Sequence, residues 1–424
     1  MSKIPLALPA LTLIAMVQAQ ANVPLDLQIL NLKSGQAIDY PLAFVYGKTT
    51  HAGSSISVNG IPWPIAGGQF KALVKLRPGR NSVVLNVAGD SAVFPLQYQP
   101  KTNTRFMRLV YFLGSDQYGD FEAPAGMPNK VEDAVARIRL AGLLMQTFYA
   151  ETGARMAKTV LGQADAPLKT FRLELDSNEE PIVHVVTSKT HTAAQLRAMR
   201  STASYPLAHD QIHAQLGGGT LKQAVIMGFS NKVYYEAQAA NGDGSAWGGG
   251  SLDGSGDGGT TACNLYAWAP SLAEFMGAMT NTKAPEAGLC RDWNFGTYFQ
   301  NYSLTVGGWF HEMGHTFGLG HTSAGIMSAD IGVTFRFFLI QDPVNKQKVY
   351  APDTEKPDLW WDRSQASMWA GAYFKVEPVS MRPYLARTRV GSDAGGASIA
   401  AGSWRLDGKR VGITVSPPKF SRLP

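Results

Sequence analysis

Residues 311–321 read HEMGHTFGLGH, which matches the pattern HExxHxxGxxH. Side chains four residues apart lie on one face of an α-helix, with about 5–6 Å between their Cβ atoms, so His311 and His315 can bind the same metal ion. Gly318 tolerates a left-handed backbone, and it can therefore end the helix and turn the chain. This turn would bring His321 to the same ion. The pattern therefore predicts a metal site with three imidazole ligands.

One carboxylate accompanies these ligands. Glu312 lies one step further round the same helix, so it is poorly placed as a ligand but can reach a water molecule on the metal. Three protein ligands leave a fourth position open, which is typical of a catalytic rather than a structural zinc site. Zinc lowers the pKa of bound water toward ~7, and Glu312 is then the expected general base. We therefore predict one catalytic Zn²⁺ and hydrolysis of a peptide bond.

A methionine follows the third histidine, in the sequence GIMS at residues 325–328. The long histidine pattern followed by such a methionine resembles the metzincin zinc peptidases. This resemblance implies a tight turn, the Met-turn, in which the Met327 side chain packs beneath the metal without binding it. It also implies a catalytic domain in which helices pack on a twisted mixed sheet.

Two longer stretches are similar to a little-characterised group of zinc metallopeptidases: GGWFHEMGHTFGLGHTSAGIM at residues 307–327 and LWWDRSQASMWAGAYF at residues 359–374. The similarity covers roughly residues 106–384 and is specific only at 307–328. No tyrosine stands two residues after Met327, so the extra tyrosine ligand of astacin-like and serralysin-like enzymes is not expected here.

The region before this catalytic part has a β pattern. Residues 70–76 alternate apolar and polar side chains, residues 77–81 (RPGRN) predict a turn, and residues 82–87 predict a further strand. Short strands at this spacing favour a small β-sandwich, which we place at residues 22–100. Its sequence resembles bacterial immunoglobulin-like modules, and this resemblance implies a spacer or a binding accessory.

Residues 101–385 form the predicted catalytic domain. A buried strand at 105–113 precedes a long helix with apolar residues at helical spacing, at Val131, Val135, Ile138, Met145 and Phe148. Gly153 is the expected end of this helix. Further strands and a short helix precede the zinc helix, the predicted helix that carries His311 and His315. The predicted fold class is therefore α+β, a metzincin-like catalytic domain with a twisted mixed sheet and helices, preceded by the immunoglobulin-like sandwich.

Residues 241–260 (NGDGSAWGGGSLDGSGDGGT) are rich in glycine. Asp243, Asp253 and Asp257 suggest a Ca²⁺ site, but their spacing does not match an EF-hand loop. We favour an exposed edge strand that binds the substrate as an added antiparallel strand, because glycines let a peptide backbone approach closely. The residues predicted for this strand are Trp247, Gly248, Gly249 and Gly250.

Two further pairs of residues could bind a metal or each other. Cys263 and Cys290 are the two cysteines, and a disulfide between them is expected if the protein is secreted. His209 and His213 are four residues apart but have no adjacent glutamate and no third histidine nearby. We interpret this pair as part of a solvent-facing helix, with a second metal site as the alternative.

Both ends of the chain have distinctive compositions. Residues 1–21 combine Lys3, an apolar run and a small-x-small cleavage signal at 19–21, which predicts a bacterial signal peptide and a secreted or periplasmic protein. Residues 386–424 form a basic extension that could contact an envelope polymer or glycan, although a solvated surface is the favoured interpretation. Eight basic residues occur from position 381 onward: Arg382, Arg387, Arg389, Arg405, Lys409, Arg410, Lys419 and Arg422.

Composition agrees with a folded enzyme. Apolar residues make up 45% of the 424 residues and charged residues 17%, which disfavours a disordered chain. We predict no transmembrane segment and no nucleic-acid partner. The function predicted is a secreted zinc endopeptidase that acts on protein or peptide substrates. The alternative is a cell-envelope or glycoprotein-binding protein with a mucin-type or vestigial peptidase activity.

Overall fold

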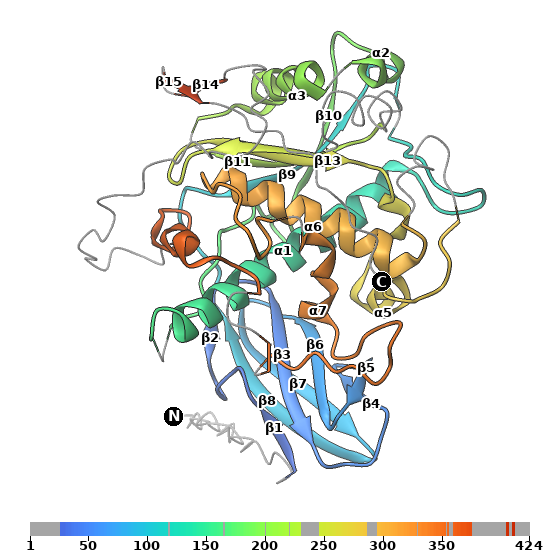
Figure 1. Cartoon of the computed structure of the whole chain (residues 1–424), viewed down its shortest axis with the longest axis vertical. Helices are drawn as coiled ribbons and strands as arrows, with labels where there is room; N and C mark the ends of the chain where they lie inside the picture. Colours follow the sequence, from blue (N-terminus) through green and yellow to red (C-terminus); the bar gives the residue numbers. More distant parts are fainter. Residues whose placement is uncertain are drawn as a thin grey trace, which may run out of the picture.

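The computed structural model describes residues 26–374, apart from 118, 164–165, 200, 220, 230–245, 286–294, 329, 353 and 356–358, together with the backbone of 404–406 and 409–411 (Figure 1). The predicted signal peptide lies outside the described residues. In the predicted basic extension only β14 (Trp404–Leu406) and β15 (Lys409–Val411) are described, and these two strands pair antiparallel. Every helix in the described part of the chain is too short or too polar to cross a membrane.

The N-terminal part is a β unit of eight strands. They are β1 (Leu27–Ile29), β2 (Ala37–Ile38), β3 (Leu42–Thr49), β4 (Ser55–Val58), β5 (Ile61–Ala66), β6 (Gln69–Lys75), β7 (Gly79–Val87) and β8 (Asp90–Tyr98). Their order is β1-β3-β6-β5-β4-β7-β8-β2, and β5 pairs with both β4 and β6. The strands expected at 70–76 and 82–87 are confirmed as β6 and as part of β7. Likeness to an immunoglobulin module stays a prediction.

The second sheet lies in the catalytic region. It contains β9 (Met107–Leu113), β10 (Val183–Thr187), β11 (Lys222–Met227), β12 (Ala246–Gly250) and β13 (Gly256–Thr261), in the order β10-β9-β11-β13-β12. All neighbours are parallel except β12, which runs antiparallel to β13. The mixed sheet expected from the sequence is therefore present, and the fold is α+β.

Helices cover both faces of this mixed sheet (Figure 1). The long helices α1 (Val131–Thr159) and α6 (Tyr298–Thr316) lie on one face, and the apolar side chains of that face join the main core. The helices α2 (Ala193–Ala198) and α3 (Ser201–Leu216) lie on the other face over a smaller core, which includes Val110, Val225 and Trp247. The sheet therefore separates two packed layers.

Helix α1 does not end at Gly153, so that prediction was wrong. The helix continues to Thr159, and a Cβ atom at Gly153 would lie 2.1 Å from Nε1 of Trp369. The glycine is therefore required by a tryptophan that packs directly on the helix backbone. Trp369 also donates a hydrogen bond to the Tyr149 carbonyl at 3.1 Å.

The β unit shares one continuous core with the catalytic region. Phe44 of β3 stacks on Phe337 with 4.8 Å between ring centroids, and Trp63 of β5 contacts Phe275 at 6.0 Å. The Thr147 hydroxyl of α1 donates to the Leu42 carbonyl at 2.6 Å. The β unit is therefore packed against the helices rather than held apart as a spacer. The predicted division of the chain near residue 100 stays a prediction.

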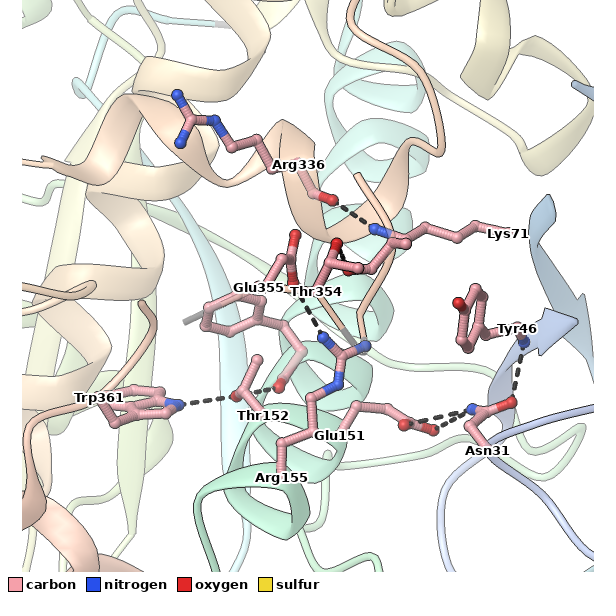
Figure 2. Close-up of polar contacts among 12 residues, drawn as sticks. Asn31, Tyr46, Lys71, Glu151, Thr152, Arg155, Arg336, Thr354, Glu355 and Trp361 are labelled. Carbon is pink, nitrogen blue, oxygen red and sulfur yellow. Dashed lines mark hydrogen bonds and ion pairs between the residues drawn. The ribbon is translucent and has the colours of Figure 1, made fainter. Parts of the chain in front are cut away.

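Polar and charged side chains also meet at the boundary between the two regions (Figure 2). Asn31 donates to both carboxylate oxygens of Glu151 in α1 at 3.3 Å, and Arg155 one turn later pairs with Glu355 at 3.2 Å. Lys71 of β6 donates to the Arg336 carbonyl at 2.6 Å. Burial lowers the pKa of Lys71 to about 7, although the Glu355 carboxylate acts in the opposite direction.

Glu151 gives the fold a specific pH dependence. Burial raises the pKa of Glu151 to about 7, despite Arg155 and the hydrogen bonds from Asn31 and Tyr40. Because this pKa is higher in the folded than in the unfolded chain, the contribution is fully present below about pH 4.3 and is lost as the pH rises through about 7. We expect a loss of up to roughly 3 kcal/mol of unfolding free energy from this group alone.

The measurement is urea denaturation of the wild-type chain and of Glu151→Gln at several pH values. The variant should lose this part of the pH dependence and be relatively more stable at alkaline pH. Glu132→Gln, on the exposed first turn of the same helix, is the control and should keep the wild-type profile. If Glu151→Gln keeps it too, the ionisation of Glu151 does not affect folding.

Candidate metal centre

Helix α6 carries the first two histidines of the motif. It begins after Thr297, which forms a capping box with Gln300, and it ends at Thr316. His311 and His315 lie one turn apart near its C-terminal end. Gly318 then has a φ of +77°, the left-handed conformation expected from the sequence. This turn places His321 beside the other two imidazoles.

The three imidazoles converge through their Nε2 atoms. Nε2 of His315 lies 3.1 Å from Nε2 of His311 and 3.2 Å from Nε2 of His321. A tetrahedral zinc ion with bonds of about 2.0–2.1 Å holds its ligand atoms roughly 3.3 Å apart. The three nitrogen atoms therefore have the spacing that one such ion requires, and these residues form one of two candidate metal-binding groups among the described residues.

Hydrogen bonds fix which ring nitrogens carry protons. Nδ1 of His311 donates to the Ile326 carbonyl at 2.7 Å, and Nδ1 of His315 donates to the Leu319 carbonyl at 2.7 Å. Both Nε2 atoms of the neutral rings then present lone pairs to each other at 3.1 Å. Lone pairs so close repel unless a cation lies among them, so this donor set fits a metal ion.

Burial also keeps these rings neutral. It lowers the pKa of His311 to about 4, with a further contribution from His321, and it lowers the pKa of His315 well below the usual value. A metal ion therefore competes with few protons for either nitrogen at neutral pH.

Glu312 lies next to His311 on α6 and is 7% exposed. Burial raises the pKa of its carboxyl group well above the usual value. A carboxylate in such an environment is a stronger proton acceptor than one in water. The position and chemistry of Glu312 therefore fit a general base.

The predicted Met-turn packs directly against α6. Met327 is fully buried, and a Cβ atom at Gly314 would lie 2.3 Å from its Sδ atom. The backbone N–H of Ile326 donates to the Trp360 carbonyl at 2.7 Å, while the Ile326 carbonyl accepts from His311. The turn therefore orients a histidine as well as filling the space beneath it. The tryptophan-containing segment at residues 359–374 therefore contacts this turn directly through Trp360.

Glycines bring the sheet onto the backbone of α6. A Cβ atom at Gly248 would lie 2.2 Å from the Glu312 carbonyl oxygen, and one at Gly258 would lie 2.7 Å from the same atom. Cβ atoms at Gly250 and Gly256 would lie 2.4 and 2.8 Å from the Thr316 carbonyl oxygen. Four glycines of β12 and β13 therefore face the helix. The glycines let the sheet approach α6 closely, whereas the sequence prediction explained them by close approach of a substrate.

The predicted substrate strand, Trp247 to Gly250, lies in β12 at the edge of the mixed sheet. Gly248 and Gly250 face α6, and Trp247 is buried on the opposite face, where it stacks on Tyr205 of α3 at 4.0 Å. Side chains of β12 therefore pack inside the protein. A role in substrate binding would depend on the backbone of β12 and stays a prediction.

The other predicted site residues are dispersed. Asp243 and Cys290 lie outside the described residues, so the Cys263–Cys290 disulfide stays a prediction. Asp253 accepts a hydrogen bond from the Ala372 N–H, while Asp257 contacts His209 and His213. The described aspartates therefore make separate contacts. The solvent-facing interpretation of the histidine pair was wrong, because both rings contact the sheet.

Sequence reasoning missed Lys222, which closes the C-terminal end of α6. Its ammonium group donates to the carbonyls of Thr316, Ser251 and Gly254, and it lies 4.6 Å from the ring centroids of Phe317 and Tyr373. The only signal in the sequence is a lysine at the start of an apolar strand. This contact fixes the end of the helix from which the chain turns to His321.

The mixed sheet, the helix beneath its edge and the converging imidazoles define a metallopeptidase-like α+β protein. A family model described as a putative peptidase family, Metallopep, matches residues 26–414, and the chain belongs to this family. The match includes both the β unit and the catalytic region.

Two curated relatives are fungal. The chain is 24% identical over 380 residues to the putative zinc metalloproteinase YIL108W of Saccharomyces cerevisiae, covering 80% of this chain and 53% of that protein. It is 21% identical over 296 residues to the putative zinc metalloproteinase C607.06c of Schizosaccharomyces pombe, covering 66% and 46%. The chain therefore spans about half the length of the curated relatives it matches.

Among solved structures, the chain is similar to wild-type OgpA from Akkermansia muciniphila, with 14% identity, a TM-score of 0.38 and coverage of 67% of this chain and 66% of that one. A catalytically inactive OgpA in complex with an O-glycopeptide has a TM-score of 0.37, 14% identity and coverage of 68% and 66%.

The contact between glycines and α6 can be tested with Gly248→Ala. The new Cβ atom would meet a backbone carbonyl that cannot move independently, so we expect a loss of about 1–3 kcal/mol in unfolding free energy. Gly277→Ala in α5 (Leu272–Ala278) is the control, because nothing lies within 4 Å of that position. It should be neutral or stabilising by up to about 1 kcal/mol. Equal stability of Gly248→Ala and wild type in urea denaturation would contradict this packing.

Proposed function

We propose that this chain is a zinc-dependent endopeptidase. His311, His315 and His321 would hold the ion, with Glu312 as general base. The observation that carries the proposal is the convergence of three Nε2 atoms, two of them fixed as lone-pair donors by hydrogen bonds from Nδ1 to backbone carbonyls. The family and the names of its two fungal relatives support a zinc peptidase. The Met-turn and the edge strand support the metzincin class.

In this mechanism the protein supplies orientation and proton transfer. A zinc ion held by His311, His315 and His321 would supply Lewis acidity and lower the pKa of a water molecule. Glu312 would accept a proton from the attacking water molecule and return it to the amine leaving group. The Ile326 and Leu319 carbonyls keep two imidazoles in the tautomer that binds metal. The Met327 side chain supports the helix from below.

The backbone of β12 is the proposed substrate-binding element. β12 is the edge strand of the mixed sheet, and it pairs with β13 on one side. A peptide added on its other side would receive backbone hydrogen bonds that do not depend on substrate sequence. Because β12 contacts the Glu312 carbonyl through Gly248, such a peptide would be held at a fixed height above the zinc helix.

Glu312→Gln tests the assignment of the base. The amide keeps the volume of the side chain but cannot accept the proton, so turnover of a casein or peptide-library substrate should fall by at least ~10²-fold. Zinc content measured by mass spectrometry should not change. Glu274→Gln, on the exposed surface of α5, should keep wild-type turnover. Cleavage by Glu312→Gln at the wild-type rate would refute the mechanism.

The metal requirement has a separate test. A chelator should abolish turnover of the wild-type chain, and added zinc should restore it. His315→Ala should remain inactive after zinc addition, because one of its three converging ligands is missing. His191→Ala is the control, since His191 is a half-buried residue outside both histidine groups. Chelator-resistant cleavage by wild type would exclude a zinc mechanism.

A further inference from the structure

A second group of potential ligands lies on the opposite face of the mixed sheet from α6. It consists of His209 and His213 of α3 and Asp257 of β13. Nε2 of His213 lies 3.2 Å from both carboxylate oxygens of Asp257, and Nδ1 of His209 contacts Oδ2 of the same group. The ligand atoms of all three residues lie within 4.8 Å of one another.

The local sequence explains why these side chains meet. The two histidines are four residues apart on α3, so they share the face that packs on the sheet. Gly256 and Gly258 face α6, and successive strand residues alternate between faces, so Asp257 faces α3. The Asp257 side chain is 5% exposed, while those of His209 and His213 are 21% and 20% exposed. The group is therefore anchored inside and open to small ions on one side.

Gln223 provides an independent sign of a ligand. It is fully buried on β11 and is the register partner of Asp257 in the parallel pair β11–β13, so both side chains face α3. Within the part of the chain that the structure describes, neither Oε1 nor Nε2 of Gln223 has a hydrogen-bond partner. A buried amide without partners is costly, and an ion with its water beside Asp257 would supply one.

We propose that His209, His213 and Asp257 form a second metal site for a divalent transition metal ion of the zinc type, with Gln223 next to it. Two imidazole nitrogens and one carboxylate are ligands that such ions prefer, whereas Ca²⁺ prefers oxygen ligands alone. The 3.2 Å separation of His213 Nε2 from the carboxylate oxygens is close to that of ligand atoms around a tetrahedral ion, roughly 3.3 Å.

The second site shares no ligand with the first and has a different role. It joins α3 to β13, and the other face of β13 contacts the Glu312 carbonyl of α6 through Gly258. A metal ion here would therefore hold in place the strand on which the zinc helix rests. We assign it a structural role, since it lies behind the sheet from the converging imidazoles of His311, His315 and His321.

The test is the metal content of purified, folded full-length protein, measured by mass spectrometry after dialysis against a zinc buffer. Wild type should contain about two zinc ions per chain, and the double variant His209→Gln/His213→Gln about one. The single variant His315→Ala should also contain about one. His191→Gln is the control for histidine number and should keep both ions.

Asp257→Asn gives a second variant, because it keeps a polar side chain of equal size while removing the charge. It should lose the same single ion, remain folded by circular dichroism and unfold at a lower temperature than wild type in zinc buffer. That difference in unfolding temperature should disappear in the presence of a chelator. Because the first set of ligands is intact, both His209→Gln/His213→Gln and Asp257→Asn should still cleave substrate if the proposed peptidase activity is correct.

A hydrogen-bonded cluster without metal is the opposing result. In that case wild type and His209→Gln/His213→Gln would contain the same amount of zinc, and His315→Ala would contain none. That outcome would overturn the second site and leave the proposed peptidase unaffected. Two ions in a wild-type protein without peptidase activity would support the second site and contradict the proposed function.

Discussion

The candidate active site depends on the hydrogen bonds from two imidazole Nδ1 atoms to the Ile326 and Leu319 carbonyls. These bonds leave the Nε2 atoms of His311 and His315 as lone-pair donors, and two lone pairs that meet at 3.1 Å are stabilised by a cation between them. Both carbonyls lie in the chain after α6, so the segment that supplies the third histidine also orients the first two. The Lys222 ammonium group at the end of α6 and the Trp360 carbonyl, which accepts from the Ile326 N–H, keep this segment in place.

The N-terminal β unit is part of the same folded body. Its half-buried Asn31 and buried Lys71 contact Glu151 and the Arg336 carbonyl, and its aromatic side chains join the core of the catalytic region. Buried charges with specific partners define one arrangement of the two regions, because any other arrangement would leave a charge without a partner. The family match covers both regions, since it spans residues 26–414.

Local sequence rules predicted the features that depend on local geometry. The positions of His311 and His315 follow from the helical repeat, and Gly318 is left-handed as its place in the motif requires. Features that depend on distant packing were not predictable. Gly153 could not be distinguished from a helix stop without Trp369, and His209 and His213 could not be assigned to a buried face without the position of Asp257. Residues 247–250 lie on an edge strand as expected, but Trp247 is buried rather than exposed, and the contact of Gly248 and Gly250 with α6 is a property of the folded chain.

The four glycines facing α6 limit which substitutions β12 and β13 can accept. At these positions the backbone of the sheet lies directly on the backbone of α6, with no side chain between them. A larger residue at any of these positions would meet a backbone carbonyl of α6, so the strand that carries it would have to move. In the proposed peptidase, this contact would keep a peptide bound to β12 at a constant distance from α6, and changes in specificity would have to arise at other positions.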